Sequence, residues 1–336
     1  MATKSGRTII AEKETTWKSR LLKWESFLLL IFILINVMNS MLSPNYLSVN
    51  GLFTATSSFL EKAFIALPMA YILVLGDIDI SVGSIVALSA CLLGIAYNAG
   101  VPMGAAILIC LTVGALCGFI NGFILTRFTE LAPMIITLGT QILYRGIAEI
   151  LLKDEAATGL TEVQWFSDLY WGKTGPVPYM FIVFVICAVI FGLVLHKTTF
   201  GRKLYAIGSN RDAAKYSGIA VQKLRLIVFT LTGLMSGVTA VFLASRMGSA
   251  RSNIASGYEM DAIAMVVLGG ISTAGGKGNF PGTIISIFII GFLRYGLGLV
   301  NVSSQIMLVI IGTLLVAAVM MPNLNLKGLI QKLKKA

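Results

Sequence analysis

The chain is poor in charge. Only 12% of its 336 residues are Asp, Glu, Lys or Arg, whereas an ordinary soluble domain carries about a quarter. Hydrophobic residues make up 57% of the chain, and the mean hydropathy is +0.87. This balance excludes a typical soluble protein and indicates a membrane protein.

Residues that bind metals or attack substrates are also scarce. His196 is the single histidine, and the four cysteines lie in apolar runs without any C-x-x-C pair. We therefore expect buried, inert thiols, no metal, no cofactor and no catalytic residues. An enzyme embedded in the membrane would need a clustered nucleophile, base or metal set, which the sequence does not supply.

The net charge of +11 does not indicate nucleic-acid binding. The basic residues occupy short polar segments between apolar runs, so they do not form one basic face and are better explained as determinants of membrane topology. We expect the lipid membrane, and no nucleic acid, as a partner.

Ten segments are long and apolar enough to span a bilayer, which requires about 20 residues per helix. Two of these segments are irregular. The second is interrupted by Glu61 and Lys62, and we expect one of these residues to mark a break. The eighth ends in a run of glycines. The sequence thus predicts an all-α, polytopic transmembrane helix bundle with a broken or re-entrant helix. The predicted segments are 26–41, 52–75, 80–97, 103–125, 133–152, 177–195, 226–244, 258–275, 282–300 and 306–321.

The orientation follows from the basic residues, because cytoplasmic loops are rich in Lys and Arg. With ten spans and both termini in the cytoplasm, 19 of the 26 fall on the inner side and four on the outer side. We expect a cytoplasmic segment 1–25, a transmembrane domain 26–321 and a basic cytoplasmic tail 322–336, in a bacterial inner membrane. No small-residue cleavage site follows the first apolar run, so a retained anchor is expected.

The outer loop 153–176 carries four aromatic residues among acidic ones. Aromatic side chains prefer membrane interfaces, but they also serve as anchors in protein interfaces. Both an interfacial belt and a docking surface for an extracytoplasmic partner remain open.

The inner loop 197–225 predicts a short helix over 210–217. Asn210 is a suitable N-cap, Asp212 lies in the favourable first turn, and Gly218 ends the helix. An exposed helix between two spans is a lever that a soluble partner can move, although a solvated surface helix has the same pattern.

This loop resembles the cytoplasmic coupling motif of ABC importer permeases, in which E-A-A is followed after three residues by G. Here the motif consists of Asp212, Ala213, Ala214 and Gly218, with Asp in place of Glu. The stretches GDIDISVGS (76–84), FGRKLYAIGSNRDAAKYSGI (200–219) and VVLGGISTAGGKGNFPGT (266–283) are similar to the ribose-type branch of this family. That branch imports pentoses, rhamnose, galactose-like sugars and autoinducer-2.

The resemblance implies an assembly. It consists of a pair of permease subunits, identical or different, two ABC ATPase subunits and an extracytoplasmic substrate-binding protein. The alternative is an ion-coupled secondary transporter, in which Asp77, Asp79 or Glu149 would bind a proton or Na⁺. The segment 266–283 fails as a nucleotide-binding loop, because Ile271 and Gly278 replace a required Gly and Ser or Thr.

The turn before the third span is a candidate gate. Its polar residues are suited to capping a helix start, coordinating a cation or forming a gate contact, and they are Asp77, Asp79, Ser81 and Ser84. Glu259 and Asp261 are expected as first-turn acids of the following apolar run. The five residues from Val74 and from Val267 are similar, which suggests an internal repeat.

Polar residues within apolar spans are candidates to line a pathway for a neutral polyol. They are Asn121, Thr137, Thr140, Gln141, Thr230 and Thr232. The same residue types also join helices by hydrogen bonds. Arg145 and Glu149 are four apart and are expected to pair with each other, whereas Gly114, Gly118 and Gly122 form a ladder that predicts close helix packing.

Overall fold

The structure, a computed structural model, describes residues 24–44, 46–153 and 155–320. The tail 322–336 and nearly all of the segment 1–25 lie outside the described residues. Within the described residues the regular structure is helical except for one two-stranded hairpin of β1 (Lys173–Thr174) and β2 (Val177–Pro178) and an isolated bridge between Ala157 and Ala250. The predicted all-α bundle is therefore confirmed.

Each of the ten predicted spans corresponds to a helix. Seven helices have the length and composition to cross a membrane. They are α2 (Trp24–Leu42), α3 (Val49–Val74), α5 (Met103–Arg127), α6 (Pro133–Leu152), α8 (Tyr179–Lys197), α11 (Val221–Met247) and α13 (Phe280–Leu299). Shorter apolar helices are α4 (Val82–Asn98), α12 (Tyr258–Leu268) and α14 (Ser304–Met320).

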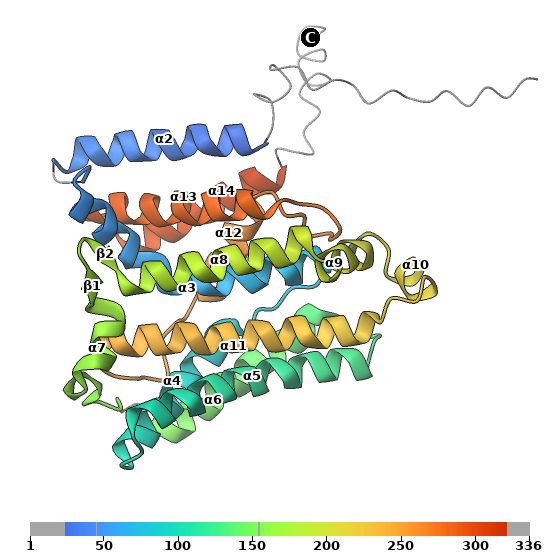
Figure 1. Cartoon of the computed structure of the whole chain (residues 1–336), viewed down its shortest axis with the longest axis horizontal. Helices are drawn as coiled ribbons and strands as arrows, with labels where there is room; N and C mark the ends of the chain where they lie inside the picture. The colour runs from blue at the N-terminus through green and yellow to red at the C-terminus, as the bar shows by residue number, and fades with distance from the viewer. Residues whose placement is uncertain (1–23, 45, 154, 321–336) are drawn as a thin grey trace, which may run out of the picture.

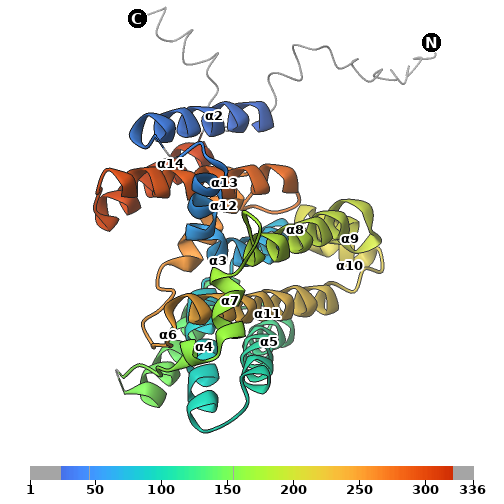
Figure 2. The ribbon, with the colours of Figure 1, turned by 60° about the vertical axis from the view of Figure 1, so that its left-hand side comes forward.

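Helix α3 is the centre of the bundle. It lies between a group formed by α2, α12, α13 and α14 and a group formed by α4, α5, α6 and α11 (Figure 2). In its most apolar stretch 83% of the residues are buried, against 22% in α6 and in α8. The outer helices therefore present apolar side chains at the surface, as expected of helices that face lipid or another subunit.

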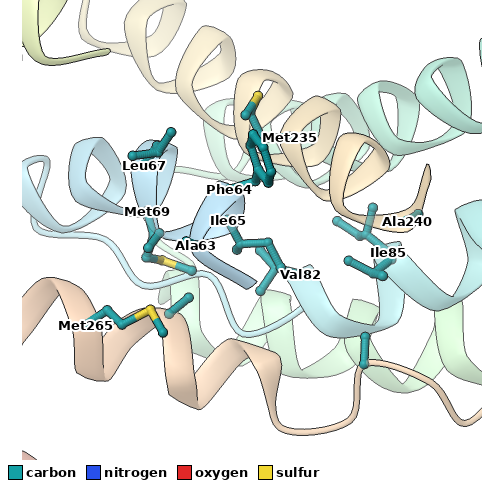
Figure 3. Packing of buried hydrophobic residues seen from close by; sticks show 14 of the residues in the cluster. Ala63, Phe64, Ile65, Leu67, Met69, Val82, Ile85, Met235, Ala240 and Met265 are labelled. Carbon is teal, nitrogen blue, oxygen red and sulfur yellow. The ribbon is translucent and has the colours of Figure 1, made fainter. Parts of the chain in front are cut away.

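Figure 3 shows how α3 joins the two groups. Phe64 points towards Met235 of α11, while Met69 on another face of α3 points towards Met265 of α12. A helix buried on all sides in this way is apolar all round. The predicted break at Glu61 and Lys62 is wrong, because α3 runs without interruption through both residues.

Helices α5 and α11 pack backbone against backbone. A Cβ atom added to Gly118 would lie 2.3 Å from the Phe229 carbonyl oxygen, and one added to Gly233 would lie 2.2 Å from the Gly114 carbonyl oxygen. The predicted close packing of the glycine ladder is thus confirmed, and the matching glycines of α11 supply the opposite surface.

The two long loops lie at opposite ends of the bundle (Figure 1). One end, here called the α10 end, carries α9 (Thr199–Ser209) and α10 (Arg211–Tyr216). The other, the α7 end, carries the 3-10 helix η1 (Leu160–Glu162), α7 (Gln164–Trp171) and the hairpin. The two long loops therefore form two separate surfaces of the chain.

Candidate coupling site and transport pathway

The predicted short helix in the inner loop is confirmed as α10. The Asn210 side chain accepts a hydrogen bond from the Ala213 N–H at 2.9 Å, which caps the helix start. Gly218 adopts a φ of +81°, a conformation that glycine tolerates and that ends the helix. Ala214 packs inwards, whereas Asp212 is exposed. The coupling role of this helix stays a prediction.

An ion-pair cluster ties α10 to the bundle. The Arg211 Nη2 atom lies 2.8 Å from Asp77 Oδ1, and the Arg225 Nε atom lies 2.5 Å from Asp77 Oδ2. Arg225 also donates to the Leu125 carbonyl at the end of α5 at 2.7 Å. Asp77 and Arg225 are only 1% and 3% exposed. The Asp77 carboxylate therefore connects α10, α11 and the turn after α3.

This arrangement corrects one interpretation of Asp77 and adds two residues. Asp77 does not cap the following helix, since its carboxylate is taken up by two guanidinium groups. In the sequence, Arg211 and Arg225 are only two of the basic residues that indicate the cytoplasmic side. A buried carboxylate at the end of a span, such as Asp77, needs a cationic partner. Which arginine supplies that partner is decided by the fold and cannot be read from the sequence.

The three stretches that resemble permeases meet at the α10 end. A Cβ atom on Gly275 would lie 2.8 Å from the Gly76 Cα atom and 3.0 Å from the Gly208 carbonyl oxygen, and one on Gly208 would lie 1.9 Å from the carbonyl oxygen of Val74, just before the first stretch. The Tyr205 hydroxyl donates to the Gly278 carbonyl at 2.9 Å. Burial raises the pKa of Tyr205, so the hydroxyl keeps its proton.

The glycine-rich segment after α12 is irregular, as predicted for a broken helix. Helix α12 ends at Leu268 and α13 begins at Phe280, with positive φ at several glycines between them. The internal repeat stays a prediction, because the sequence match pairs Gly76 with Gly269, whereas the glycine of like geometry is the next one. Gly76 (φ +78°) corresponds to Gly270 (φ +92°), and each donates to the third residue before it at 2.9 Å.

A buried hydrogen-bond chain starts at Asp79. Its Oδ1 atom accepts from the Ser81 N–H at 2.9 Å and from the Ser81 hydroxyl at 2.6 Å. Asn121 donates to Ser81 at 2.8 Å, and the Tyr144 hydroxyl donates to Asn121 at 3.0 Å. The helix-start role is confirmed for Asp79. Asn121 acts here as a link between α4, α5 and α6.

The other predicted pathway residues do not gather around one path. Thr230 and Thr232 donate to carbonyls of their own helix, and Thr140 does the same. Thr137 donates to the Pro133 carbonyl at 3.0 Å and lies 3.4 Å from the Ile78 carbonyl oxygen. Gln141, by contrast, lines a cavity.

That cavity has a volume of about 430 Å³ and lies among α4, α6 and the start of α12. Six of its eight lining residues are polar or charged, among them the gate candidate Ser84. The lining residues are Ser84, Gln141, Ile142, Arg145, Gly146, Glu149, Ser256 and Glu259. Thr137, Gln141, Arg145 and Glu149 recur every four residues along one face of α6.

The predicted pair of Arg145 and Glu149 is wrong. Arg145 donates instead to the carbonyls of Ser252 and, at 2.8 Å, Ile254, in the segment before α12. Gln141 donates to Glu259 Oε1 at 3.3 Å. Backbone carbonyls that face the cavity region therefore satisfy the guanidinium, and Glu149 remains exposed.

A second ion-pair network lies nearer the α7 end. Glu61 of α3 pairs with Arg246 at the end of α11 and accepts from the Tyr258 hydroxyl at 3.4 Å. Asp261 pairs with Lys62 at 3.1 Å and with Arg294 of α13. Asp261 is a first-turn acid as expected, but its carboxylate serves as the anchor of this network.

The aromatic residues of the outer loop divide into two pairs. Phe166 and Tyr170 are buried against the bundle, whereas Trp165 and Trp171 are 51% and 61% exposed. The Tyr170 hydroxyl donates to the Ser57 carbonyl at 3.1 Å. Burial, with a smaller effect from Glu61, raises the pKa of Tyr170 to about 12. The exposed pair is free for a membrane interface or a partner.

A bundle of apolar helices with a capped, exposed helix ion-paired to its core defines a polytopic transport protein. Residues 51–319 match the family model described as "Branched-chain amino acid transport system / permease component". Two curated relatives are named autoinducer 2 import system permease protein LsrD, from Escherichia coli O9:H4 (strain HS) and Shigella flexneri. Both are 38% identical over 90% of this chain and 93% of their own length.

The LsrD of Photorhabdus temperata is 36% identical over 90% of this chain and 92% of its own length. No solved structure matches the chain significantly. The chain therefore belongs to the ribose-type family of ABC importer permeases. It is a multi-pass membrane protein and a transport subunit, not itself an enzyme.

Proposed function

We propose that the chain is the permease of a bacterial inner-membrane importer for a small sugar-like molecule. Two separate ABC ATPase subunits supply the energy at the α10 end. A substrate-binding protein delivers the ligand at the α7 end, where Trp165 and Trp171 are exposed. A second permease subunit, identical or different, completes the path through the membrane.

The observation that carries this proposal is the ion pair between Arg211 and Asp77. The outer face of α10 offers Asp212, Lys215 and Tyr216, the last of which is 90% exposed. A force applied to this face reaches α11 through Asp77 and Arg225. A coupling helix needs such a connection, because packed side chains and ion pairs are what carry coupling between distant sites.

The substrate class rests on the relatives. They are named as permeases for autoinducer 2, and we extend this ligand to the present chain ahead of pentoses and rhamnose. All three are small neutral molecules with several hydroxyl groups. The polar cavity of about 430 Å³ is within the range of sites for small ligands.

The test is ATP-dependent uptake by the complete importer in proteoliposomes. We expect Gly218→Val and Asp212→Lys to insert normally but to lose uptake and the stimulation of ATPase activity, because each changes α10 without touching the core. Glu130→Lys, a charge reversal at an exposed loop residue, is the matched control. Normal uptake by the α10 variants would count against the proposal.

The same assay examines the ion-coupled alternative. Asp77 is held by two arginines, which leaves Asp79 and Glu149 as the carboxylates for an ion, since Asp79 Oδ2 has no partner among the described residues and Glu149 is exposed. Uptake that persists without ATP while an ion gradient is present would favour a secondary transporter. Uptake that requires ATP in both the presence and the absence of that gradient supports the importer.

A further inference from the structure

We propose that the cavity among α4, α6 and α12 is a binding site for a neutral polyhydroxylated ligand, which donates hydrogen bonds to Glu259, Glu149 and Ser84. This inference deepens the proposed function and rests on it. It assigns a transient station for the ligand within the permease itself, distinct from the site on the binding protein.

Two cavity-lining atoms lack a hydrogen-bond partner among the described residues. They are Ser84 Oγ and Glu259 Oε2, on side chains that are 0% and 7% exposed. Buried polar atoms are nearly always satisfied, so an orphaned pair around one cavity requires an explanation. Both atoms are closed to solvent in this structure, but their residues line the cavity, so a turn of either side chain would present its oxygen to a ligand hydroxyl there.

The backbone is shaped to hold the Glu259 carboxylate. A Cβ atom on Gly83 would lie 2.4 Å from Glu259 Oε2 and 2.7 Å from the Ala255 carbonyl oxygen. Any other residue at position 83 would therefore displace the carboxylate or the start of α12. Glycine lets α4 approach this carboxylate closely, one residue before Ser84.

The charge of the lining selects the ligand class. The Arg145 guanidinium donates hydrogen bonds to the carbonyls of Ser252 and Ile254 and is therefore held by the protein backbone. The remaining lining carboxylates, Glu149 and Glu259, can only accept hydrogen bonds when ionised. Glu259 Oε1 already accepts from Gln141, which leaves Oε2 of Glu259 and both oxygens of Glu149 for ligand hydroxyls. A donor-rich polyol fits this set, whereas an anion would be repelled.

The exposed position of Glu149 supports the same assignment. An ionised side chain on a spanning helix is costly in lipid and usually faces water or a partner. The stripe of Gln141, Arg145 and Glu149 must therefore face an aqueous path or a neighbouring subunit. Ile142 and Ile150, both 74% exposed, mark an apolar surface on the same helix.

The first experiment measures uptake and ATP hydrolysis together, in the full importer with saturating loaded binding protein. The probes are labelled autoinducer-2, D-ribose and L-rhamnose. For whichever probe the wild type imports, we expect Glu259→Gln and Ser84→Ala to reduce molecules imported per ATP about tenfold, with ATPase stimulation retained. Thr112→Ala, at an exposed threonine of α5 bonded to its own helix, is the control.

A second measurement does not depend on turnover. Ser256 lies at the cavity and is exposed, so Ser256→Cys should react with a positively charged, water-soluble methanethiosulfonate. The native protein gives the background, and three of its four cysteines are buried. We expect the imported probe sugar to slow the reaction at least threefold, and Gly83→Ala to abolish this protection.

The outcomes separate the two levels of inference. If the wild type imports a probe but the cavity variants import as much per ATP as it does, and no protection occurs, the binding site is refuted while the importer stands. Protection by choline and not by the sugars would show that the ligand class is wrong. A wild type without ATP-dependent uptake of any probe would refute the proposed function itself.

Discussion

Both ion-pair networks of the bundle consist of buried carboxylates with Arg or Lys partners, but they differ in the number of carboxylates and in the exposure of the cations. At the α10 end one carboxylate, Asp77, holds two arginines, of which Arg225 has a side chain only 4% exposed and Arg211 one that is 41% exposed. Nearer the α7 end the charges are spread over two centres. Arg246, the partner of Glu61, is 39% exposed, and Asp261 has two partly buried cations.

This difference shows what each network can tolerate. The network at the α10 end, here called the inner network, consists of Asp77, Arg211 and Arg225. Asp77 is its single carboxylate, so the loss of Asp77 leaves the charge of Arg225 without compensation. The outer network, nearer the α7 end, is redundant at Asp261, which keeps one cation when the other is removed, whereas Glu61 pairs with Arg246 alone among the described residues. We infer that the inner network is the brittle junction through which α10 moves the bundle, and that the outer network holds four helices together.

Removal of the inner carboxylate should have the largest effect. Asp77→Asn leaves a buried guanidinium unpaired, and breaking a buried pair in this way costs about 3–5 kcal/mol. We expect a marked fall in the thermal midpoint of the detergent-solubilised complex and less protein in membranes. Glu130→Gln, at an exposed loop residue, is the control. A midpoint equal to that of the wild type would show that Arg225 finds another partner.

The corresponding change in the outer network should cost less. In Glu61→Gln the amide still accepts from Tyr258, and Arg246 can turn towards solvent since it is 39% exposed. We expect a loss of about 1–2 kcal/mol, between the values for exposed and buried pairs. The same thermal measurement, with Glu162→Gln as control, checks this. A loss as large as that of Asp77→Asn would remove the contrast between the networks.

Removal of one cation from the redundant centre should have a still smaller effect. Lys62→Met keeps a long apolar side chain near the Tyr258 ring, over which the Lys62 Nζ atom lies at 4.6 Å. Asp261 retains Arg294, so we expect a change below about 1 kcal/mol. The double variant with Arg294→Met should lose more than the two single changes added together, because only then is Asp261 unpaired. Simple additivity would contradict the redundancy.

The fold was predictable from the sequence to a large extent because its signals are local. Each span is an apolar run, and α10 is defined by its own cap and by the glycine that follows it. The glycine ladder of α5 likewise indicated close packing without knowledge of the partner helix. The prediction of a break at Glu61 was wrong because the charge that compensates Glu61, Arg246, lies 185 positions away and cannot be recognised as its partner from the sequence.

The candidate site was less predictable for the same reason. Asp77 was recognised as important, but its partner Arg225 lies 148 positions away and is defined only by the fold. The cavity combines Ser84, Gln141 and Glu259 from three helices. In the sequence these residues have separate local explanations. Threonines that bond to their own helix, such as Thr232, could not be distinguished from pathway residues by residue type.

The smallest effect on stability is expected for Arg211, the residue whose loss should nevertheless impair the coupling of α10 to the bundle. Arg211→Gln removes the half-exposed partner of Asp77 and leaves the buried pair with Arg225 intact, so stability should fall by less than about 1 kcal/mol. Uptake and ATPase stimulation should nevertheless fall, because α10 loses its ionic contact with the bundle. Arg202→Gln on the exposed face of α9 is the matched control.

Recovery by Arg211→Lys would show that charge alone carries the link, whereas continued failure would indicate that the guanidinium must also reach the Leu75 carbonyl, 3.5 Å away. Full activity in Arg211→Gln would instead mean that α10 acts on the bundle through its backbone. The carbonyl of Val74, packed against Gly208, is then the remaining route. The inner network would in that case share the merely structural role assigned to the outer one.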